Sequence, residues 1–350
     1  MRSLVQRGIA ASLVAGAFIL AGCAGNLSDS LTAPASASGS SLSRAGSPAQ
    51  LQVHGNAFAL ESPAKLVSNH RGSWMARGAA STTLLYVADE ATGDVDVYSY
   101  PKGQLVGTLT GFNTPSGLCS DKGGDVYILN GGGFTVDVFA HGGTSPIRTL
   151  SLPGYPELNC SVNPRTGDLA LGTFDGSCAE CAAFIAIFPG GQGLPTTYQP
   201  SGQIGIPGCG YDNAGNLYCD AYSKIGRKFL LFELPKKSTT VQTIAVSGTL
   251  PKAGPVQWDG QNLAVGSGAT STIDQIAVSG SSGSVLGSTT LYGAGWVWQF
   301  WITKHGSRIV VPTYAGTSAA EVGYWSYPAG GSATKAITGF YQPDGATLSR

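Results

Sequence analysis

Short apolar runs, each bounded by Gly, Pro, Asn or Asp, follow one another from about residue 84 to the last residues of the sequence. Runs of this kind, separated by turn residues, predict short β-strands. Five phrases pair a polar turn with an apolar strand: DKGGDVYILN, PRTGDLALGT, DNAGNLYCDA, DGQNLAVGSG and HGSRIVVPTY. Their apolar strands begin near Val126, Leu169, Leu217, Leu263 and Ile309, and a sixth strand, LLYVADE, begins near Leu84.

The phrases recur at intervals of 42 to 48 residues, so the pattern is an internal repeat. A third strand follows the apolar strand in each unit, for example VDVYSY in the first and VDVFAH in the second. Repeats of this length with several short strands are typical of β-propeller blades, each of which is a four-stranded sheet. Six units therefore predict an all-β, six-bladed β-propeller over residues 81–350.

The first unit lacks the opening strand that segments such as PSGLCSD and IPGCGYD supply to later units, and QPDGATLS at residues 342–349 supplies it. We expect this C-terminal strand to complete the first blade as its innermost strand, because that removes two exposed sheet edges. Together the repeat and this closure resemble NHL-type six-bladed β-propellers over about residues 81–350. The resemblance implies an architecture and not an activity, since one superfold hosts many functions. The segment WVWQFWITKHG departs from the repeat, because no Pro or Gly opens it.

The N-terminal residues have the features of an export signal. Arg2 and Arg7 precede an uncharged stretch, residues 8–21, which is shorter than the roughly 20 apolar residues that span a bilayer. The stretch ends in LAGC, which resembles a bacterial lipoprotein signal. Residues 1–22 are therefore expected to be a signal peptide and Cys23 the lipidated first residue, with an ordinary secretory signal as the alternative. Acylated Cys23 would hold the chain at the cell envelope, on the periplasmic or extracellular face of a bacterial membrane.

Two segments separate this signal from the repeats. Residues 24–50 are mostly Ser, Ala, Gly and Pro, a composition with too little apolar surface to repay ordering. Residues 23–50 are therefore predicted to be the lipidated cysteine and a disordered tether. Residues 51–80 show no clean period of 2 or 3.6, but Trp74 and Met75 indicate a lead-in that docks on the propeller.

The composition narrows the classes of partner. Only 11 % of the 350 residues are charged, against about 25 % in average proteins, and 51 Gly and 19 Pro favour turns. The 20 basic and 20 acidic side chains cancel, so no strong field attracts phosphate backbones. Nucleic acid is therefore excluded as the expected partner.

Six cysteines remain when Cys23 is set aside, an even number that predicts disulfides in an oxidising compartment. A hairpin that turns about Ala214 places Cys209 opposite Cys219, at the separation that a cross-strand disulfide needs. This pair is the first that we expect.

Cys119 and Cys160 occupy equivalent places on neighbouring innermost strands and form a second candidate pair. Cys178 and Cys181 are expected to form a structural loop disulfide. Half of a metal site or a redox pair are the alternatives, but the sequence has no second C-x-x-C motif and no thioredoxin-like βαβ pattern around this one.

No catalytic phrase is present: the sequence lacks G-x-S-x-G, H-E-x-x-H, a P-loop and G-x-G-x-x-G. We therefore predict no catalytic residue, no metal ligand and no cofactor. The four histidines, His54, His70, His141 and His305, lie before the propeller or in apparent loops, so the His-built metal centres of some NHL-like lyases have no counterpart here.

Acidic residues are interpreted as turn residues. The group Asp89, Glu90, Asp94 and Asp96 lacks the alternating pattern of a calcium loop and is interpreted as a solvated hairpin turn. Asp121, Asp212 and Asp259 recur at the first turn of their units, where Asp commonly bonds its own backbone.

A polar set lies on predicted innermost strands, whose ends line the central channel where propellers often bind ligands. Glu157 and Asn159 share one strand face, and Asp344 follows its proline as Glu157 does. The set resembles the six-bladed lactonases, which draw carboxylates and amides from different blades around one divalent metal. Ordinary polarity at a channel mouth is the alternative interpretation.

An aromatic set, WVWQFW at residues 296–301, also lies on a predicted innermost strand. Most of it is expected to be core between blades. Trp298, Phe300 and Trp301 are nevertheless candidates for stacking on sugar rings or on the side chains of a partner protein.

The sequence as a whole predicts a non-enzymatic module that binds a protein or carbohydrate ligand at the cell envelope, attached to the membrane through its lipid anchor. A metal-dependent, lactonase-like hydrolase that uses the central channel is the alternative, and a bound divalent ion would distinguish it. A scaffold subunit of an envelope complex is a third possibility, marked by a large contiguous apolar patch.

Overall fold

The structure, a computed structural model, describes residues 72–152, 155–174, 183–303, 306–313 and 320–350. These residues form 25 β-strands and three short 3-10 helices, η1 (Ala79–Ser81), η2 (Gly131–Gly133) and η3 (Pro189–Gly191). The fold is all-β, as the short apolar runs predict.

Antiparallel neighbours follow one another along the chain in short sheets. The first sheet has the order β1-β4-β3-β2-β25, with β1 (Trp74–Met75), β2 (Leu84–Asp89), β3 (Asp94–Ser99), β4 (Gln104–Leu109) and β25 (Pro343–Ser349). The second contains β5 (Pro115–Ser120), β6 (Val126–Asn130), β7 (Thr135–Phe139) and β8 (Pro146–Ser151). The third contains β9 (Tyr155–Val162), β10 (Leu169–Phe174), β11 (Phe184–Phe188) and β12 (Thr196–Tyr198).

The other twelve strands form three antiparallel runs joined into one sheet. The first run is β13 (Gln203–Tyr211), β14 (Leu217–Ser223), β15 (Phe229–Leu234) and β16 (Gln242–Ser247). The second is β17 (Val256–Trp258), β18 (Leu263–Gly266), β19 (Thr272–Ser279) and β20 (Ser282–Tyr292). The third is β21 (Trp301–Ile302), β22 (Arg308–Thr313), β23 (Glu321–Ser326) and β24 (Gly330–Thr338). Parallel pairs β16–β20 and β20–β24 link the runs.

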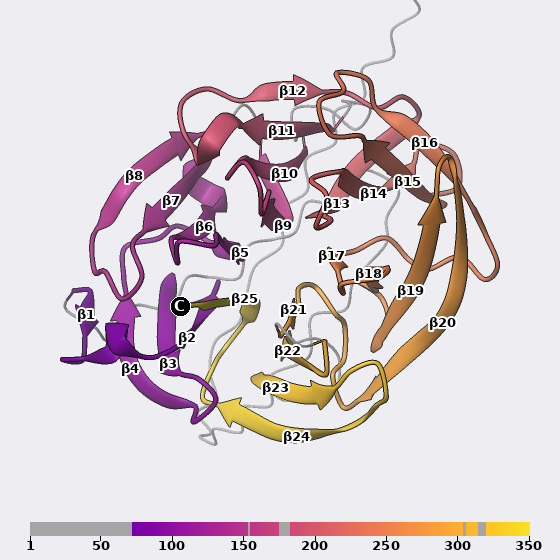
Figure 1. Cartoon of the computed structure of the whole chain (residues 1–350). Helices are drawn as coiled ribbons and strands as arrows, with labels where there is room; N and C mark the ends of the chain where they lie inside the picture. Colours follow the sequence, from indigo (N-terminus) through magenta and orange to yellow (C-terminus); the bar gives the residue numbers. More distant parts are fainter. Residues whose placement is uncertain (1–71, 153–154, 175–182, 304–305, 314–319) are drawn as a thin grey trace, which may run out of the picture. The chain divides into compact units, whose positions relative to one another are not determined.

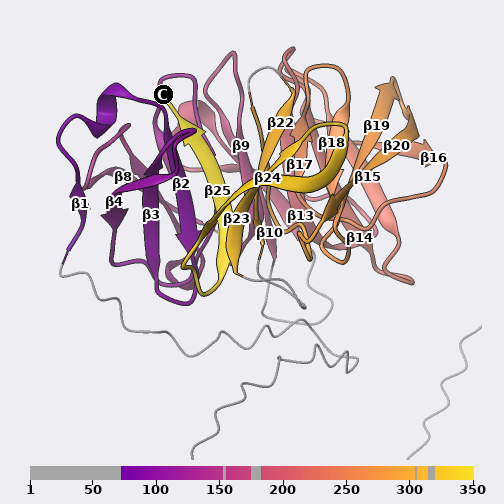
Figure 2. The same cartoon turned by 90° about the horizontal axis from the view of Figure 1, so that it is seen from below.

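Figure 1 shows the runs arranged around a common centre. The strands β5, β9, β13, β17 and β25 lie nearest this centre, whereas β8, β12, β16, β20 and β24 lie at the rim (Figure 1). Figure 2 shows the same residues from the side, with β25 next to β2. The innermost strand of each run therefore meets the innermost strands of its neighbours.

The six apolar strands that define the repeat are present. Five of them, β2, β6, β10, β14 and β18, begin at the predicted residue, and β22 begins one residue earlier, at Arg308. The segment QPDGATLS contributes β25, which pairs antiparallel with β2 so that Val87 lies opposite Ala346. In the lead-in, Trp74 and Met75 form β1 and pair with β4. Residues 51–71 of the lead-in lie outside the described part of the chain.

Apolar side chains on the two faces of one strand belong to different cores. Leu84 of β2 packs with Leu118 of β5, whereas Leu85, which points to the opposite face, packs with Val310 of β22. Side chains alternate between the faces of a strand, so a strand covered on both sides needs apolar residues at every position. This explains why LLYVAD has no polar face. Four further core clusters join successive runs in the same way.

The repeated aspartates form turns, as predicted. Asp121 Oδ1 accepts a hydrogen bond of 2.9 Å from the backbone N–H of Asp125. Asp212 Oδ1 accepts two such bonds. Asp259 Oδ1 accepts hydrogen bonds from the backbone N–H groups of Gln261 and Asn262. These carboxylates belong to the local turns, because each replaces a backbone acceptor.

The prediction of a solvated turn at residues 89–96 is wrong for two carboxylates. Asp89 and Asp94 are 4 % and 5 % exposed. Asp89 accepts hydrogen bonds from the backbone N–H groups of Tyr341 and Gln342, at 2.8 and 3.0 Å. The carboxylate is buried because it satisfies the backbone that leads into β25, a contact across 250 residues of sequence that no local pattern shows.

The prediction that WVWQFW is an inner strand is also wrong for most of its length. Only Trp301 belongs to a strand, β21, and residues 296–300 form none. The backbone N–H of Val297 donates instead to the carbonyl of Ser267, and the side chain of Gln299 binds other strands. The segment therefore crosses between runs.

Candidate functional site

Asn159 lies on β9 and is 1 % exposed. Its Oδ1 accepts a hydrogen bond of 3.0 Å from the backbone N–H of Cys209, and its Nδ2 donates at 3.3 Å to the carbonyl of Val256. The amide thus joins β9 to β13 and β17. Ligation by Asn159 would break two buried hydrogen bonds, so the side chain is committed to the fold rather than to a ligand.

Gln299 makes a corresponding connection between two other inner strands and was not among the residues predicted from the sequence. Its Oε1 accepts hydrogen bonds from the backbone N–H groups of Leu118 (3.2 Å) and Ala346 (2.7 Å), and its Nε2 donates to the carbonyl of Leu118 at 2.8 Å. The residue is 0 % exposed and joins β5 to β25. One signal in the sequence could have identified Gln299, because it is the one amide inside an aromatic segment. A buried amide has hydrogen-bond partners, so such a residue is expected to connect other parts of the fold.

A third amide, Gln257 of β17, binds the segment next to β21. Its Nε2 donates to the carbonyl of Phe300 at 2.5 Å, and its Oε1 accepts from the backbone N–H of Ile302 at 3.0 Å. The amides of Asn159, Gln257 and Gln299 therefore hold neighbouring inner strands together through backbone groups. Their polar atoms have the partners that they need within the protein.

The aromatic candidates divide into core and partly exposed residues. Phe300 is 0 % exposed and belongs to the core between the runs β17–β20 and β21–β24, so its selection as a ligand-stacking residue is wrong. Trp301 packs against the core that includes Val310. Trp298 is half-buried and contacts the ring of Trp296 edge to face, with centroids 5.7 Å apart. Packing decides these positions, because each large ring fills space between neighbouring sheets.

Asp344 lies on β25 in a group of polar side chains next to the end of β2. Gln342 Nε2 donates hydrogen bonds to Glu90 Oε2 and, at 3.5 Å, to Asp344 Oδ2. Burial raises the pKa of Asp344 well above its usual range, and a hydrogen bond with Glu90 and the negative charge of Glu90 raise it further. The carboxyl group of Asp344 therefore takes up a proton more readily than that of an ordinary aspartate.

Glu157 lies within β9, and its side chain is outside the part of the chain that the structure describes. Its predicted convergence with Asp344 stays a prediction. Among the described residues, no three side chains of His, Cys, Asp or Glu gather in a way that could hold a metal ion. The described partners of Asn159 are backbone groups, as given above, so the lactonase-like ligand set is not assembled through that residue.

Two cysteine pairs are disulfides. Cys209 and Cys219 lie opposite each other on β13 and β14 and are bonded, as the hairpin turning about Ala214 predicts. Cys119 and Cys160 are bonded across β5 and β9. Disulfides are typical of an oxidising, extracytoplasmic environment.

The other cysteine predictions lie outside the described residues: lipidation at Cys23 and the bond between Cys178 and Cys181. In the described ranges, no helix has the length and apolar character that crossing a membrane requires.

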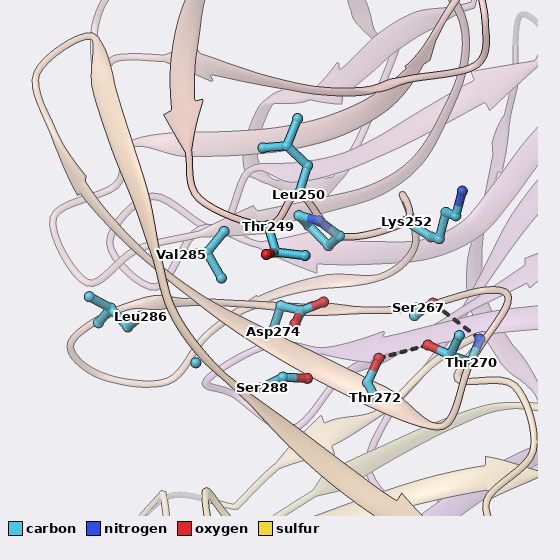
Figure 3. Close-up of a pocket in the computed structure, with 12 residues that line it drawn as sticks. Thr249, Leu250, Lys252, Ser267, Thr270, Thr272, Asp274, Val285, Leu286 and Ser288 are labelled. Carbon is cyan, nitrogen blue, oxygen red and sulfur yellow. Dashed lines mark hydrogen bonds between the residues drawn. The ribbon is translucent and has the colours of Figure 1, made fainter.

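A cavity of about 520 Å³ lies at the rim, between the β16–β17 connection and the β19–β20 hairpin (Figure 3). Its lining contains Thr249, Leu250, Pro251, Lys252, Ser267, Thr270, Thr272, Asp274, Val285, Leu286, Gly287 and Ser288. Figure 3 shows Asp274 in the middle of this lining, between Thr249 and Ser288. We call it the rim cavity. The sequence analysis selected none of these residues, because they come from separate strands with no shared motif.

Comparison with solved structures identifies the architecture. The chain aligns with the β-propeller domain of Cps50 (Swd1) from Myceliophteria thermophila, with a TM-score of 0.52 and 11 % identity over 79 % of this chain and 89 % of that one. The protein has a β-propeller fold. The chain also aligns with a structure of a nidogen–laminin complex, with a TM-score of 0.59 and 14 % identity over 77 % of this chain and 98 % of that one.

A third propeller-like match is a protein of unknown function from Bacteroides caccae, with a TM-score of 0.57 and 9 % identity over 77 % of this chain and 99 % of that one. Structural similarity at identities this low indicates a shared fold but no shared activity. No protein-family model matches the chain, and no curated protein matches it.

Proposed function

We propose that the chain is an exported, lipid-anchored, six-bladed β-propeller that acts as a non-enzymatic binding module at the cell envelope. Each antiparallel run is one blade, and β25 completes the blade formed by β1–β4. The pairing of β25 with β2 supports this closure, as does the core that packs Leu85 and Leu348 against Val310 of the last run. A propeller that joins its ends in this way protects its sheet edges.

The single observation that favours binding over catalysis is the use of Asn159. Its two polar atoms serve the backbone of Cys209 and Val256, so the amide that a lactonase-like site would need is held inside the fold. Hydrolysis requires a group that polarises the carbonyl, an activated water and a positioned acid or base within hydrogen-bond reach. The described residues around Asp344 supply carboxyl groups and the amide of Gln342, which bond to one another.

Metal content and hydrolysis test this proposal. The purified chain is analysed for bound Ca²⁺, Mn²⁺ and Zn²⁺ and assayed on a panel of lactones and simple esters with each ion added. We expect no metal-dependent turnover, in the unchanged chain or in the Glu157→Ala and Asp344→Ala variants. Stoichiometric metal together with turnover that disappears in Glu157→Ala would establish the hydrolase instead.

Export and anchoring have a separate test. The motif LAGC and the tether of residues 23–50 support attachment through Cys23. In bacteria that express the full chain, labelled palmitate should appear in the protein and the protein should sediment with membranes. The Cys23→Ala variant should lose the label and the membrane association. Retention of both in that variant would contradict the lipid anchor.

A further inference from the structure

Asp274 stands out among the polar residues that line the rim cavity. It lies on β19 opposite Ser288 of β20 and is half-buried. The hydroxyl group of Ser288 interacts with this carboxylate, and an ionised carboxylate accepts about four hydrogen bonds. Burial raises the pKa of Asp274, which the Ser288 hydrogen bond partly offsets. The carboxylate therefore has unused acceptor capacity that faces a cavity.

The charge of the lining favours a neutral ligand. Lys252 and Asp274 are the two ionisable side chains of the rim cavity, so their charges cancel. Figure 3 shows Lys252 on one side of Asp274 and Leu286 on the other. A cationic ligand would meet the ammonium group, and an anionic ligand would meet the carboxylate. A neutral ligand that donates and accepts hydrogen bonds meets a partner at both.

Hydroxyl and apolar side chains make up most of the rest of the lining. Thr249, Thr270, Thr272 and Ser288 carry hydroxyl groups, and the Thr270 and Thr272 oxygens lie 2.7 Å apart in a hydrogen-bonded pair. Leu250, Val285 and Leu286 supply carbon surface, and Leu286 is 58 % exposed. Sugar rings combine hydroxyl groups with C–H faces that lose contact with water on apolar side chains. The volume, about 520 Å³, lies within the range of about 300–1,000 Å³ typical of small-ligand sites.

We propose that the rim cavity binds a neutral saccharide, with Asp274 accepting hydrogen bonds from ring hydroxyls, Lys252 donating to ring oxygens and Leu286 covering a C–H face. The inference rests on the proposed binding function and gives it a place and a ligand class. It moves the expected ligand contact from the aromatic segment near the central channel to the hairpin β19–β20.

Ligand-observed saturation-transfer NMR on the full chain tests this assignment. The detergent must lack a sugar headgroup, because a glycoside would compete. Maltose, cellobiose, lactose and N,N′-diacetylchitobiose are the neutral probes, and glucuronic acid and lysine methyl ester are the charged ones. We expect at least one neutral disaccharide to bind with a Kd in the millimolar range, because the lining has no aromatic ring on which a sugar could stack.

The variants are chosen to separate binding from folding. Asp274→Ala should weaken binding of that disaccharide by about 10-fold or more, since a charge-assisted hydrogen bond is lost. Lys252→Ala and Leu286→Ala change exposed side chains and should each weaken binding about 3-fold or more with an unchanged melting temperature. Glu233→Gln is the matched control, because Glu233 is also a carboxylate whose pKa burial raises, and it lies on β15, outside the cavity. Binding by this variant should stay within about 2-fold.

Three results would overturn the assignment. The first is the absence of saturation transfer to any neutral disaccharide when its concentration is raised 20-fold above that of a first screen. The second is equal affinity of the unchanged chain and the Asp274→Ala variant for the disaccharide. The third is Asp274-dependent binding of lysine methyl ester without any saccharide binding. Each leaves the non-enzymatic function standing, because that proposal depends on the lactone and metal measurements. Metal-dependent hydrolysis, in turn, would overturn the proposed non-enzymatic function, but it would not contradict an observed binding of saccharide.

Discussion

The innermost strands and the rim use their polar side chains in different ways. At the centre, Asn159, Gln257 and Gln299 are bound to backbone groups of neighbouring strands. At the rim, Asp274 interacts with the hydroxyl group of Ser288 and faces a cavity. A buried amide without partners would cost free energy, so the centre can contain such groups only when the fold satisfies them.

This difference indicates where a ligand finds unused hydrogen-bonding groups. A central location by itself makes no binding site, because each inner strand needs contacts with the next one and its polar side chains provide them. Side chains at the rim are held by fewer neighbours and remain able to bind a molecule from solution. The predictions below test this comparison, beginning with the centre.

Deleting residues 342–350 should have the largest effect. The deletion removes β25, its pairing with β2 and its contacts with Gln299. We expect a loss of at least about 5 kcal/mol in the free energy of unfolding, which is a third or more of the roughly 5–15 kcal/mol of a typical domain. Thermal and urea unfolding measure it. An unchanged melting temperature would contradict the closure by β25.

Gln299→Leu should have the next largest effect. Leucine leaves the buried N–H groups of Leu118 and Ala346 without their acceptor, and each unsatisfied group costs about 1–3 kcal/mol. We expect the free energy of unfolding to fall by about 2–6 kcal/mol. Gln104→Leu, on the exposed face of β4, is the control and should change it by less than about 0.5 kcal/mol. Similar values for both variants would show that the central amide is dispensable.

The two disulfides should differ in their effect on stability. Cys119 and Cys160 are 41 residues apart, whereas Cys209 and Cys219 are 10 apart. In the chain-entropy description, these loops correspond to about 4 and about 3 kcal/mol. Replacing each pair by alanine and comparing urea unfolding should therefore show the larger loss for the bond between β5 and β9. The opposite order would mean that local packing outweighs loop entropy.

Asp344→Asn should have the smallest effect, and its sign should depend on pH. The folded state raises the pKa of Asp344 above the usual 3.8, so the protonated form is the one that folding favours. Its contribution to stability is present below about pH 3.8 and is lost as the pH rises through the raised pKa. We therefore expect Asp344→Asn to be more stable than the unchanged chain at pH 7.

The stability difference should shrink as the pH falls towards 3.8. Melting temperatures between pH 3.5 and about pH 8 measure it. A difference independent of pH would show that Asp344 is ionised in both states. Asp137→Asn, a change on β7 at a carboxylate that accepts hydrogen bonds from Thr149 and Asn130, provides a comparison for the general effect of removing a carboxylate.

Much of the fold was predictable because its determinants are local. Three features each depend on residues within a single hairpin: the start of β10 at Leu169, the turn at Asp212 and the bond between Cys209 and Cys219. The pairing of QPDGATLS with β2 was predictable for another reason, since the repeat itself shows which strand the first unit lacks. The segment WVWQFW was predicted wrongly, because its contacts with Ser267 and Leu118 come from other repeats.

The candidate sites were less predictable than the fold. Asn159 was selected by strand alternation, but its partners come from two other runs and decide that it is structural. Asp274 belongs to no motif, and only the neighbouring β16–β17 connection turns it into part of a cavity. A local pattern shows which side chains share a face, but it does not show what covers that face.

The sequence by itself determined most of the strands and turns, the repeat and the partner of the last strand, because hydrophobic alternation and turn chemistry act over a few residues. The tertiary structure decided which polar groups are satisfied and which remain available. Asp89 is buried against the backbone of Tyr341 and Gln342, while Asp274 faces the rim cavity. The two aspartates differ in what the fold brings to them from distant parts of the chain, and the cost of burying an unpaired charge makes that difference decisive.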